Sequence, residues 1–327
     1  MVTVLLPVRD EESNVVACLD TLLAQTAMPW IRVIDDGSAD ATAALVAERA
    51  AVEPRLTLLA AGPPPPGWRG KVHALWMGAQ GVTTPWLLTT DADTRHDPEL
   101  LARALAAADR WGLDAVSLAG AQETAGLYQH LLVPLVFALL DALLGDWREA
   151  ARSTGPPVAN GQFLLLRRQS WESSGGFAAV RGEAIDDVAV VSRLRRHGFR
   201  SGFFRALGLL KVRMYQGSSA ALRGWRRNLG GLLGPRPAAV AAALAVLAAP
   251  AAILFYACAS GCLAAAVLMW GAGAASSAIL RSGSGHRPGF GLLYPFDALL
   301  LAWVLARGAH DFRRGHLCSW KGREMNV

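Results

Sequence analysis

The chain reads Trp86-Leu87-Leu88-Thr89-Thr90-Asp91-Ala92-Asp93, an apolar run that ends in two carboxylates one residue apart. The apolar part predicts a buried strand. Because alternate residues of an extended segment point to the same side, Asp91 and Asp93 can both reach one divalent cation. That geometry suits a metal ion that bridges a diphosphate. Acidic pairs are also common at solvated strand ends, so the pair alone leaves both interpretations open.

Strand and helix patterns alternate ahead of this pair. Strands are predicted at Val2–Leu6, Ile31–Ile34, Leu56–Leu59 and Trp86–Thr90, with helices at Glu11–Gln25 and Ala41–Ala51. This alternation predicts an α/β fold with a mainly parallel, doubly wound sheet, whose ligands bind at the carboxyl ends of the strands. Asp35-Asp36 and Asp91-Ala92-Asp93 both fall at such ends, so we expect them at one edge of the sheet.

The segment Gly62–Lys71 lies between these two acidic pairs and contains four consecutive prolines followed by Gly67-Trp68-Arg69-Gly70-Lys71. It is not a phosphate-binding P-loop, because proline stands where the first glycine is needed and Val72 follows the lysine. No G-x-G-x-x-G opens the first helix, which disfavours a dinucleotide oxidoreductase. We expect a stiff loop whose final cation holds a phosphate; a plain surface loop is the alternative.

A third acidic group, Glu183-Ala184-Ile185-Asp186-Asp187, leads into a predicted helix. Carboxylates at a helix start are favoured by the helix dipole alone. A carboxylate that faces a dry pocket is also the usual general base for a hydroxyl. Upstream, Asn160-Gly161-Gln162 precedes a strand-like run at Phe163–Leu166.

The composition changes near Arg236. Residues 238–280 contain no Asp, Glu, Lys or Arg, and these 43 residues are enough for two membrane spans. We predict a helical hairpin broken near Ser260-Gly261. A third apolar run, Gly289–Ala306, contains Pro295 and Asp297 and fits a span, a re-entrant segment, an interfacial helix or a buried soluble helix. Gly126–Leu144 fits the membrane surface or the core equally.

The net charge of +6 is concentrated beside the apolar runs. The two clusters are Arg213, Arg223, Arg226, Arg227 and Arg236, and Arg307, Arg313, Arg314, Lys321 and Arg323. Such clusters mark the cytoplasmic side of a membrane, which favours two crossings and a third segment that does not cross. Because these charges flank apolar segments and accompany no recognised binding motif, nucleic acid is not an expected partner.

The start of the chain predicts no signal peptide, since its apolar run ends at Pro7. Cys18, Cys258, Cys262 and Cys318 form no metal-ligand or disulfide pattern. These observations predict a multi-pass protein of the plasma (inner) membrane with its catalytic part in the cytoplasm. The expected domains are 1–235 (catalytic), 236–310 (membrane helices, two or three segments) and 311–327 (basic tail).

Taken together, these residues resemble a family 2 glycosyltransferase with the GT-A fold, over roughly residues 2–235. The resemblance is carried by Pro7-Val8-Arg9-Asp10-Glu11, by Val33–Asp40, by Asp91-Ala92-Asp93 and by Asp186-Asp187. It implies that Pro7, Asp35 and Asp36 lie in the nucleotide-sugar site, with Asp35 or Asp36 at the base or ribose. It also implies that Asp91 and Asp93 bind Mg²⁺ or Mn²⁺ and the sugar diphosphate, and that Asp187 is the catalytic base.

Two further segments narrow the resemblance to a membrane-bound branch that glycosylates carotenoid, hopanoid and ceramide-type lipids. These are Gly67–Lys71 and Trp320-Lys321-Gly322-Arg323. By this resemblance Lys71 is expected to approach the diphosphate of the donor. Two features depart from the pattern. The Q-x-x-R-W motif of processive polysaccharide synthases is absent, and Gly224–Asn228 stands in its region, where Trp225 and Arg226 are expected to close the donor site. Many relatives also begin with a membrane helix that this chain lacks.

The resulting prediction is an inverting, metal-dependent hexosyltransferase that moves a sugar from a UDP- or GDP-sugar to a membrane lipid, isoprenoid or related. Transfer to a polyprenyl phosphate is the nearest alternative, because that acceptor is already ionised and needs little help from a base. Polysaccharide synthesis is a second. A non-catalytic membrane regulator that binds nucleotide is a third, and a nucleotidyltransferase is disfavoured because its glycine-rich, lysine-bearing opening strand is missing.

Overall fold

The computed structural model describes residues 1–327 except 125, 145–156, 184, 216, 234–235 and 315–327. The chain forms two compact units. The first contains Met1–Ala121 and Leu144–Val212, and the second contains Gln122–Leu143 and Arg213–Val327. Two segments that precede the expected boundary at residue 235, Gln122–Leu143 and residues 213–233, belong to the second unit; the domain boundaries themselves stay a prediction. The predicted tail motif Trp320–Arg323 lies outside the described residues.

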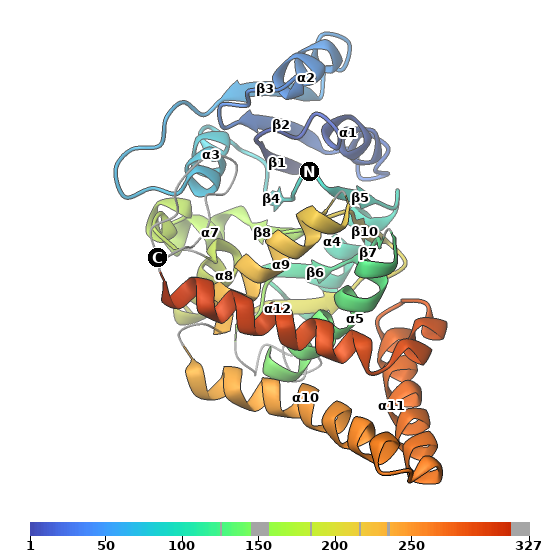
Figure 1. The fold of residues 1–327 in the computed structure, drawn as a ribbon. Helices are drawn as coiled ribbons and strands as arrows, with labels where there is room; N and C mark the ends of the chain where they lie inside the picture. Colours follow the sequence, from blue (N-terminus) through green and yellow to red (C-terminus); the bar gives the residue numbers. More distant parts are fainter. Residues whose placement is uncertain (125, 145–156, 184, 216, 234–235, 315–327) are drawn as a thin grey trace. The chain divides into compact units, whose positions relative to one another are not determined.

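The first unit is built on a seven-stranded sheet with the order β3-β2-β1-β4-β8-β6-β9 (Figure 1). Its strands are β1 (Val2–Val8), β2 (Trp30–Asp35), β3 (Leu56–Ala60), β4 (Trp86–Thr89), β6 (Ala115–Ala119), β8 (Leu164–Arg167) and β9 (Ser201–Arg205). β1 pairs in parallel with β2 and β4, and β2 with β3, whereas β8 is antiparallel to β4 and β6. A second sheet has the order β5-β10-β7, formed by Thr94–His96, Leu210–Val212 and Ala121–Gln122.

The helices of this unit are α1 (Val15–Leu23), α2 (Thr42–Ala50), α3 (Gly70–Ala79), α4 (Leu100–Trp111), α7 (Arg168–Ser173) and α8 (Asp186–Arg196), with the 3-10 turn η1 (Phe177–Val180). The predicted strands and helices therefore agree with the structure to within a few residues, and the mainly parallel α/β sheet is confirmed. One prediction needs correction. Lys71 does not end a loop, because α3 begins at Gly70 and places Lys71 in its first turn.

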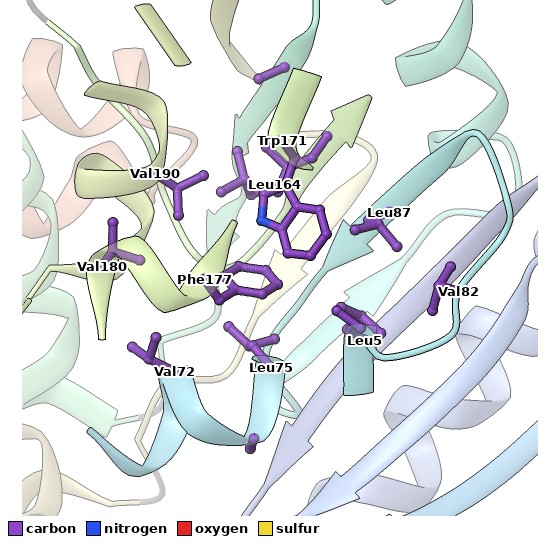
Figure 2. Close-up of a cluster of buried hydrophobic side chains, with 14 of the residues drawn as sticks. Leu5, Val72, Leu75, Val82, Leu87, Leu164, Trp171, Phe177, Val180 and Val190 are labelled. Carbon is purple, nitrogen blue, oxygen red and sulfur yellow. The ribbon is translucent and has the colours of Figure 1, made fainter. Parts of the chain in front are cut away.

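A single apolar core holds α3 and α8 in place in the first unit. Val72 and Leu75 of α3 pack in one buried cluster with Val190, Val191 and Leu194 of α8. Figure 2 shows Trp171 and Phe177 at the centre of this cluster, and their ring centroids lie 5.0 Å apart. Since both helices rest on this core, the first turns that carry Lys71 and Asp187 are fixed with respect to each other.

The second unit is helical. Its helices are α5 (Gly126–Leu144), α9 (Ser218–Leu233), α10 (Pro237–Ala259), α11 (Leu263–Gly283) and α12 (Phe296–Arg313), with the 3-10 turn η2 (Pro288–Leu293). α9 is amphipathic, and Ala221, Trp225, Leu229 and Leu233 recur every four residues along its buried face. They pack with residues of α5, α10 and α12, and Figure 1 shows α9 and α12 side by side.

Within the described part of the chain, two helices of this unit are long and apolar enough to cross a membrane, as judged by length and composition. α10 and α11 have mean hydropathies of 2.4 and 1.7, and only 17% of each apolar window is buried within the protein. They are separated at Ser260–Cys262, close to the predicted break. The third apolar run forms α12, which carries Asp297, Arg307, Asp311 and Arg313 and does not meet the same measure.

A buried ion pair ties α11 to α12 inside the second unit. Arg281 Nη2 lies 2.7 Å from Asp297 Oδ2, and both side chains are essentially inaccessible. Ser277 Oγ donates to the same carboxylate oxygen at 2.6 Å, and Arg281 also donates to the His130 carbonyl oxygen of α5. Because every charge in this group has a partner, the cluster fixes the end of α11 against its neighbours.

The close crossing of α9 and α12 depends on Gly230 and Gly308, where an added Cβ would lie within 2.6 Å of the facing helix backbone. It gives the first prediction. A Cβ placed at Gly308 would lie 2.5 Å from the Arg226 carbonyl oxygen, whereas a Cβ at Gly271 of α11 meets no atom within 4 Å. Gly308→Ala is therefore expected to cost about 1–3 kcal/mol through overpacking and to lower the melting temperature in detergent. Gly271→Ala should leave it unchanged or raise it slightly. Equal melting temperatures for the two variants would contradict the close crossing.

Candidate active site

The first-turn lysine of α3 faces the acidic pair that follows β4. Lys71 Nζ lies 2.7 Å from Asp91 Oδ1, and the two side chains are 27% and 33% exposed, so the pair is open to a ligand on one side. Burial by itself lowers the pKa of Lys71, but the negative charges of Asp91, Asp186 and Asp187 outweigh burial and hold this pKa above its ordinary value. The lysine is therefore a permanent cation in a ring of carboxylates.

Asp93 carries an oxygen without a partner. Its Oδ1 is buried and has no hydrogen-bond partner among the residues that the structure describes. Burial, together with the nearby charges of Asp91 and Glu11, raises the pKa of Asp93 to about 7. A buried carboxylate oxygen without a donor is costly unless a cation or a proton meets it. Asp93 is thus suited to bind a positive ligand.

A buried polar network fixes the loop that holds this pair. Thr90 Oγ1 donates to the Gln162 carbonyl oxygen at 2.7 Å and lies 3.1 Å from His96 Nε2. Thr94 Oγ1 donates to the Asp91 carbonyl oxygen at 2.6 Å. Burial, with a smaller contribution from Arg95, lowers the pKa of His96 to about 3, so this imidazole stays neutral.

Asp187 lies in the first turn of α8, where the helix dipole favours a negative charge. Its Oδ1 accepts a hydrogen bond from the backbone N–H of Val188 at 2.8 Å, and the nearby backbone of Gly161 favours the charged form. Burial is the largest influence on it, and together with the charge of Asp186 it raises the pKa of Asp187 to about 7, against the opposing effect of Lys71. A carboxylate with a pKa near neutrality is able to accept a proton in the physiological range.

The loop before α3 is joined to the segment before α8. The backbone N–H of Arg69 donates to the Arg181 carbonyl oxygen at 2.8 Å, and Arg69 Nε donates to the Gly182 carbonyl oxygen at 3.1 Å. These bonds hold the Gly67–Lys71 segment beside the approach to Asp186 and Asp187.

The expected nucleotide-binding residues lie at the neighbouring strand ends. Pro7 is the second-to-last residue of β1 and Asp35 is the last residue of β2, and the two strands pair in parallel. Asp35 accepts a 2.5 Å hydrogen bond from Ser38 Oγ, and Asp36 is buried with its carboxylate 3.8 Å from Arg9 Nη1. The structure therefore places Pro7, Asp35 and Asp36 at the same sheet edge as Asp91. Their contact with a nucleotide stays a prediction.

Trp225 and Arg226 belong to the second unit. Trp225 is buried against Phe137 and Tyr215, and Arg226 Nη2 lies 2.5 Å from Asp311 Oδ2. Both side chains thus have structural partners within that unit. Their expected contact with the donor sugar stays a prediction as well.

The acidic pair fits a divalent cation only if a ligand supplies further oxygens. Among the residues that the structure describes, no group of three or more His, Cys, Asp or Glu side chains is placed to hold a metal ion. Mg²⁺ is commonly held by one or two carboxylates together with substrate phosphates. Asp91 with the unpartnered oxygen of Asp93 matches that arrangement and not a closed protein cage.

Sequence reasoning missed several residues that shape this site. Thr90, Thr94, His96 and Gln162 form the buried support, and Glu11 adds charge near Asp93. The threonines beside the acidic pair are a weak local signal. The other residues carry none, because their partners come from segments far away along the chain.

Comparison with known proteins identifies the class to which this fold and site belong. Residues 3–134 match the profile of glycosyl transferase family 2, and residues 86–306 match that of glycosyl transferase family group 2. The second match covers more than half of the chain. The chain belongs to glycosyl transferase family group 2, which confirms the predicted family.

The individual relatives share about a quarter of their aligned residues with this chain. The chain is 24% identical over 234 residues to the 4,4'-diaponeurosporenoate glycosyltransferase of Staphylococcus haemolyticus strain JCSC1435, covering 70% of this chain and 60% of the relative. It is 25% identical over 251 residues to the enzyme of the same name from Staphylococcus aureus strain MRSA252, covering 73% and 64%. The chain thus spans about three fifths of the length of these relatives.

One solved structure supports the fold. A mannosyltransferase from Pyrobaculum calidifontis, solved in complex with GDP-Man and Mn2+, superimposes with a TM-score of 0.55 at 23% identity. The match covers 92% of this chain and 86% of that one. This likeness confirms the GT-A fold.

The unpartnered Asp93 oxygen gives the second prediction. Asp93→Asn removes the carboxylate charge while keeping the shape, so binding of Mn²⁺ together with UDP or GDP is expected to weaken at least about tenfold. Titration calorimetry with both nucleotides measures the effect. Asp109→Asn, an exposed change on α4, should bind like the unmodified protein. Equal Mn²⁺-dependent binding by Asp93→Asn and Asp109→Asn would remove Asp93 from the metal site.

Proposed function

We propose that the protein transfers a sugar from a UDP- or GDP-sugar to a membrane lipid acceptor, isoprenoid or related, with inversion at the anomeric carbon. The observation that carries the proposal is the ring of carboxylates around Lys71. One cation faces Asp91, Asp186 and Asp187 at the carboxyl edge of the sheet, where a donor diphosphate and an acceptor hydroxyl have to meet.

Asp91 and Asp93 are the residues that would hold Mg²⁺ or Mn²⁺. When bound, the cation supplies Lewis-acid stabilisation of the charge that grows on the leaving diphosphate. The GDP-Man and Mn2+ in the mannosyltransferase complex are consistent with this assignment. Lys71 adds a second positive charge to the leaving group, and its contact with Asp91 holds the amine toward that side.

Asp187 is proposed as the base. It accepts the proton of the acceptor hydroxyl as the acceptor oxygen attacks the anomeric carbon from the face opposite the diphosphate. A single displacement of this kind inverts the configuration. The Val188 N–H donates to the carboxylate and orients it.

The acceptor is proposed to reach the site from a bilayer. α10 and α11 expose large apolar side chains such as Ile253, Phe255, Leu268 and Ile279, which suits contact with lipid. We propose that these helices anchor the protein in the plasma membrane with the catalytic unit on the cytoplasmic side. The relatives are named for a carotenoid-type substrate, diaponeurosporenoate, which is consistent with a lipid acceptor.

The function is tested with purified, detergent-solubilised protein, Mn²⁺, a panel of UDP- and GDP-sugars and host lipid extract. We expect release of nucleotide from one donor only when lipid is present, with a glycolipid product detected by mass spectrometry. Release without lipid and without product would indicate hydrolysis. Nucleotide binding with no release from any donor would favour a non-catalytic regulator.

Replacement of Asp187 distinguishes two classes of acceptor, which is the third prediction. With a hydroxyl acceptor, Asp187→Asn removes the base and should lower kcat at least about 100-fold. With an acceptor that is already ionised, such as a carboxylate or a phosphate, the loss should stay below about tenfold because no proton has to leave. Asp109→Asn serves as the control at unchanged activity.

The fourth prediction concerns pH. A raised pKa means that Asp187 is protonated and unable to act as a base below about pH 7 and ionised above it. With a hydroxyl acceptor and saturating Mn²⁺, kcat should therefore rise with pH, with a midpoint near 7, and level off above it. Stopped assays between pH 5 and 9 measure the profile. A rate that is flat across this range would show that Asp187 does not titrate in the reaction.

A further inference from the structure

The turn formed by Asn160-Gly161-Gln162 lies between the two groups that the proposed reaction needs. A Cβ placed on Gly161 would be 3.0 Å from Lys71 Nζ and 3.5 Å from Asp187 Oδ2. The α-carbon of Gly161 therefore faces both the cation and the carboxylate. A 3.0 Å approach is tighter than an ordinary van der Waals contact, so a methyl group at this position would push the lysine amine aside by a few tenths of an ångström.

The backbone of this turn is held by the buried hydroxyl group of Ser117 and by the side chain of Asn160. Ser117 Oγ on β6 accepts the N–H of Asn160 at 2.8 Å and donates to the Asn160 carbonyl oxygen at 3.2 Å. The Asn160 side chain accepts the N–H of Gln162 at 3.0 Å. Ser117 and Gln162 are both buried, so solvent does not compete for these bonds.

The same turn is connected to the acidic loop after β4. Thr90 donates to the Gln162 carbonyl oxygen at 2.7 Å, and Thr90 and Thr94 lie 3.1 Å apart through their Oγ1 atoms. Thr94 in turn holds the Asp91 carbonyl oxygen. Since each threonine hydroxyl donates its one proton to a carbonyl oxygen, the two are joined through His96, whose Nε2 lies 3.1 Å from Thr90 Oγ1 and 3.4 Å from Thr94 Oγ1. This network links the turn beside Asp187 to the loop that carries Asp91 and Asp93.

We propose that Gly161 is the positioning residue that sets the separation between the base, Asp187, and the phosphate-binding cation, Lys71. Its missing side chain lets the Lys71 amine and the Asp187 carboxylate both lie close to the backbone of the turn. This inference rests on the proposed function. It adds a role for the Asn160–Gln162 turn, which acts through Asp187 and Lys71 and not on the substrate itself.

The test is a graded series at Gly161 in the full-length protein. Misplacement of reacting groups by about 1 Å can cost about 100-fold in rate, so Gly161→Ala should lower kcat about tenfold and Gly161→Val about 100-fold or more. The Kd for UDP or GDP with Mn²⁺ should rise by a smaller factor than kcat falls, because Asp91 and Asp93 are unchanged and the bonds of Asn160 and Gln162 still hold the turn. Gly208→Ala is the matched control, since a Cβ there meets no atom within 4 Å and the backbone needs no left-handed conformation.

A second variant avoids adding volume to the site. Ser117→Ala removes the hydroxyl that anchors Asn160, and the loosened turn should lower kcat and raise the pH midpoint, since the Gly161 backbone then stabilises the Asp187 carboxylate less well. Ser174→Ala is its control, because Ser174 is also buried and loses one hydrogen bond to the Trp171 carbonyl oxygen. A melting temperature lowered equally in both serine variants, with kcat and pH midpoint unchanged in Ser117→Ala, would show a structural role alone.

Failure of the inference and failure of the proposed function give different results. If the unmodified protein binds nucleotide and releases it with lipid, but Gly161→Val turns over at the same rate, the assignment of Gly161 is overturned and the function stands. If the unmodified protein binds neither UDP nor GDP, the proposed function itself falls and the inference falls with it.

Discussion

The ion pair between Lys71 and Asp91 is the interaction on which the site depends. It joins the first turn of α3 to the loop after β4 at 2.7 Å and brings one cation within the field of three carboxylates. Like charges placed this close repel strongly in a partly buried environment, and the lysine offsets that repulsion. Without it, Asp91, Asp186 and Asp187 would have to be separated, protonated or neutralised by another cation. When a metal ion and a diphosphate bind, Asp91 can turn to the metal ion and Lys71 to the diphosphate in place of their contact with each other.

The remainder of the first unit maintains this arrangement. One apolar core seats α3 and α8 with their first turns facing the site, and the Thr90 network fixes the loop after β4. The second unit is held by an apolar cluster in which α9 packs with α5, α10 and α12. A buried ion pair between Arg281 and Asp297 holds the end of α11. The two apolar helices α10 and α11 extend from this packed part and expose most of their surface.

Local pattern was sufficient to predict much of the fold from the sequence. The strands β1 to β4 are short β-branched or leucine runs bounded by turn residues, and their alternation with helices implied the parallel sheet. The acidic residues at strand ends followed from the same logic. The antiparallel placement of β8 was not predictable, because strand direction within a sheet depends on pairing partners distant in sequence. The start of α3 at Gly70 was missed because the preceding prolines favoured an extended loop.

Local pattern also predicted part of the candidate site, the acidic residues at strand ends. Asp91 and Asp93 share a strand end, whereas the meeting of Lys71, Asp187 and Gly161 depends on three separate segments that only the packed core brings together.

The central claim is a single displacement assisted by Asp187. Its most direct test is the anomeric configuration of the glycolipid product, measured by NMR. The account predicts the configuration opposite to that of the sugar in the donor. A product that retains the donor's configuration would contradict it.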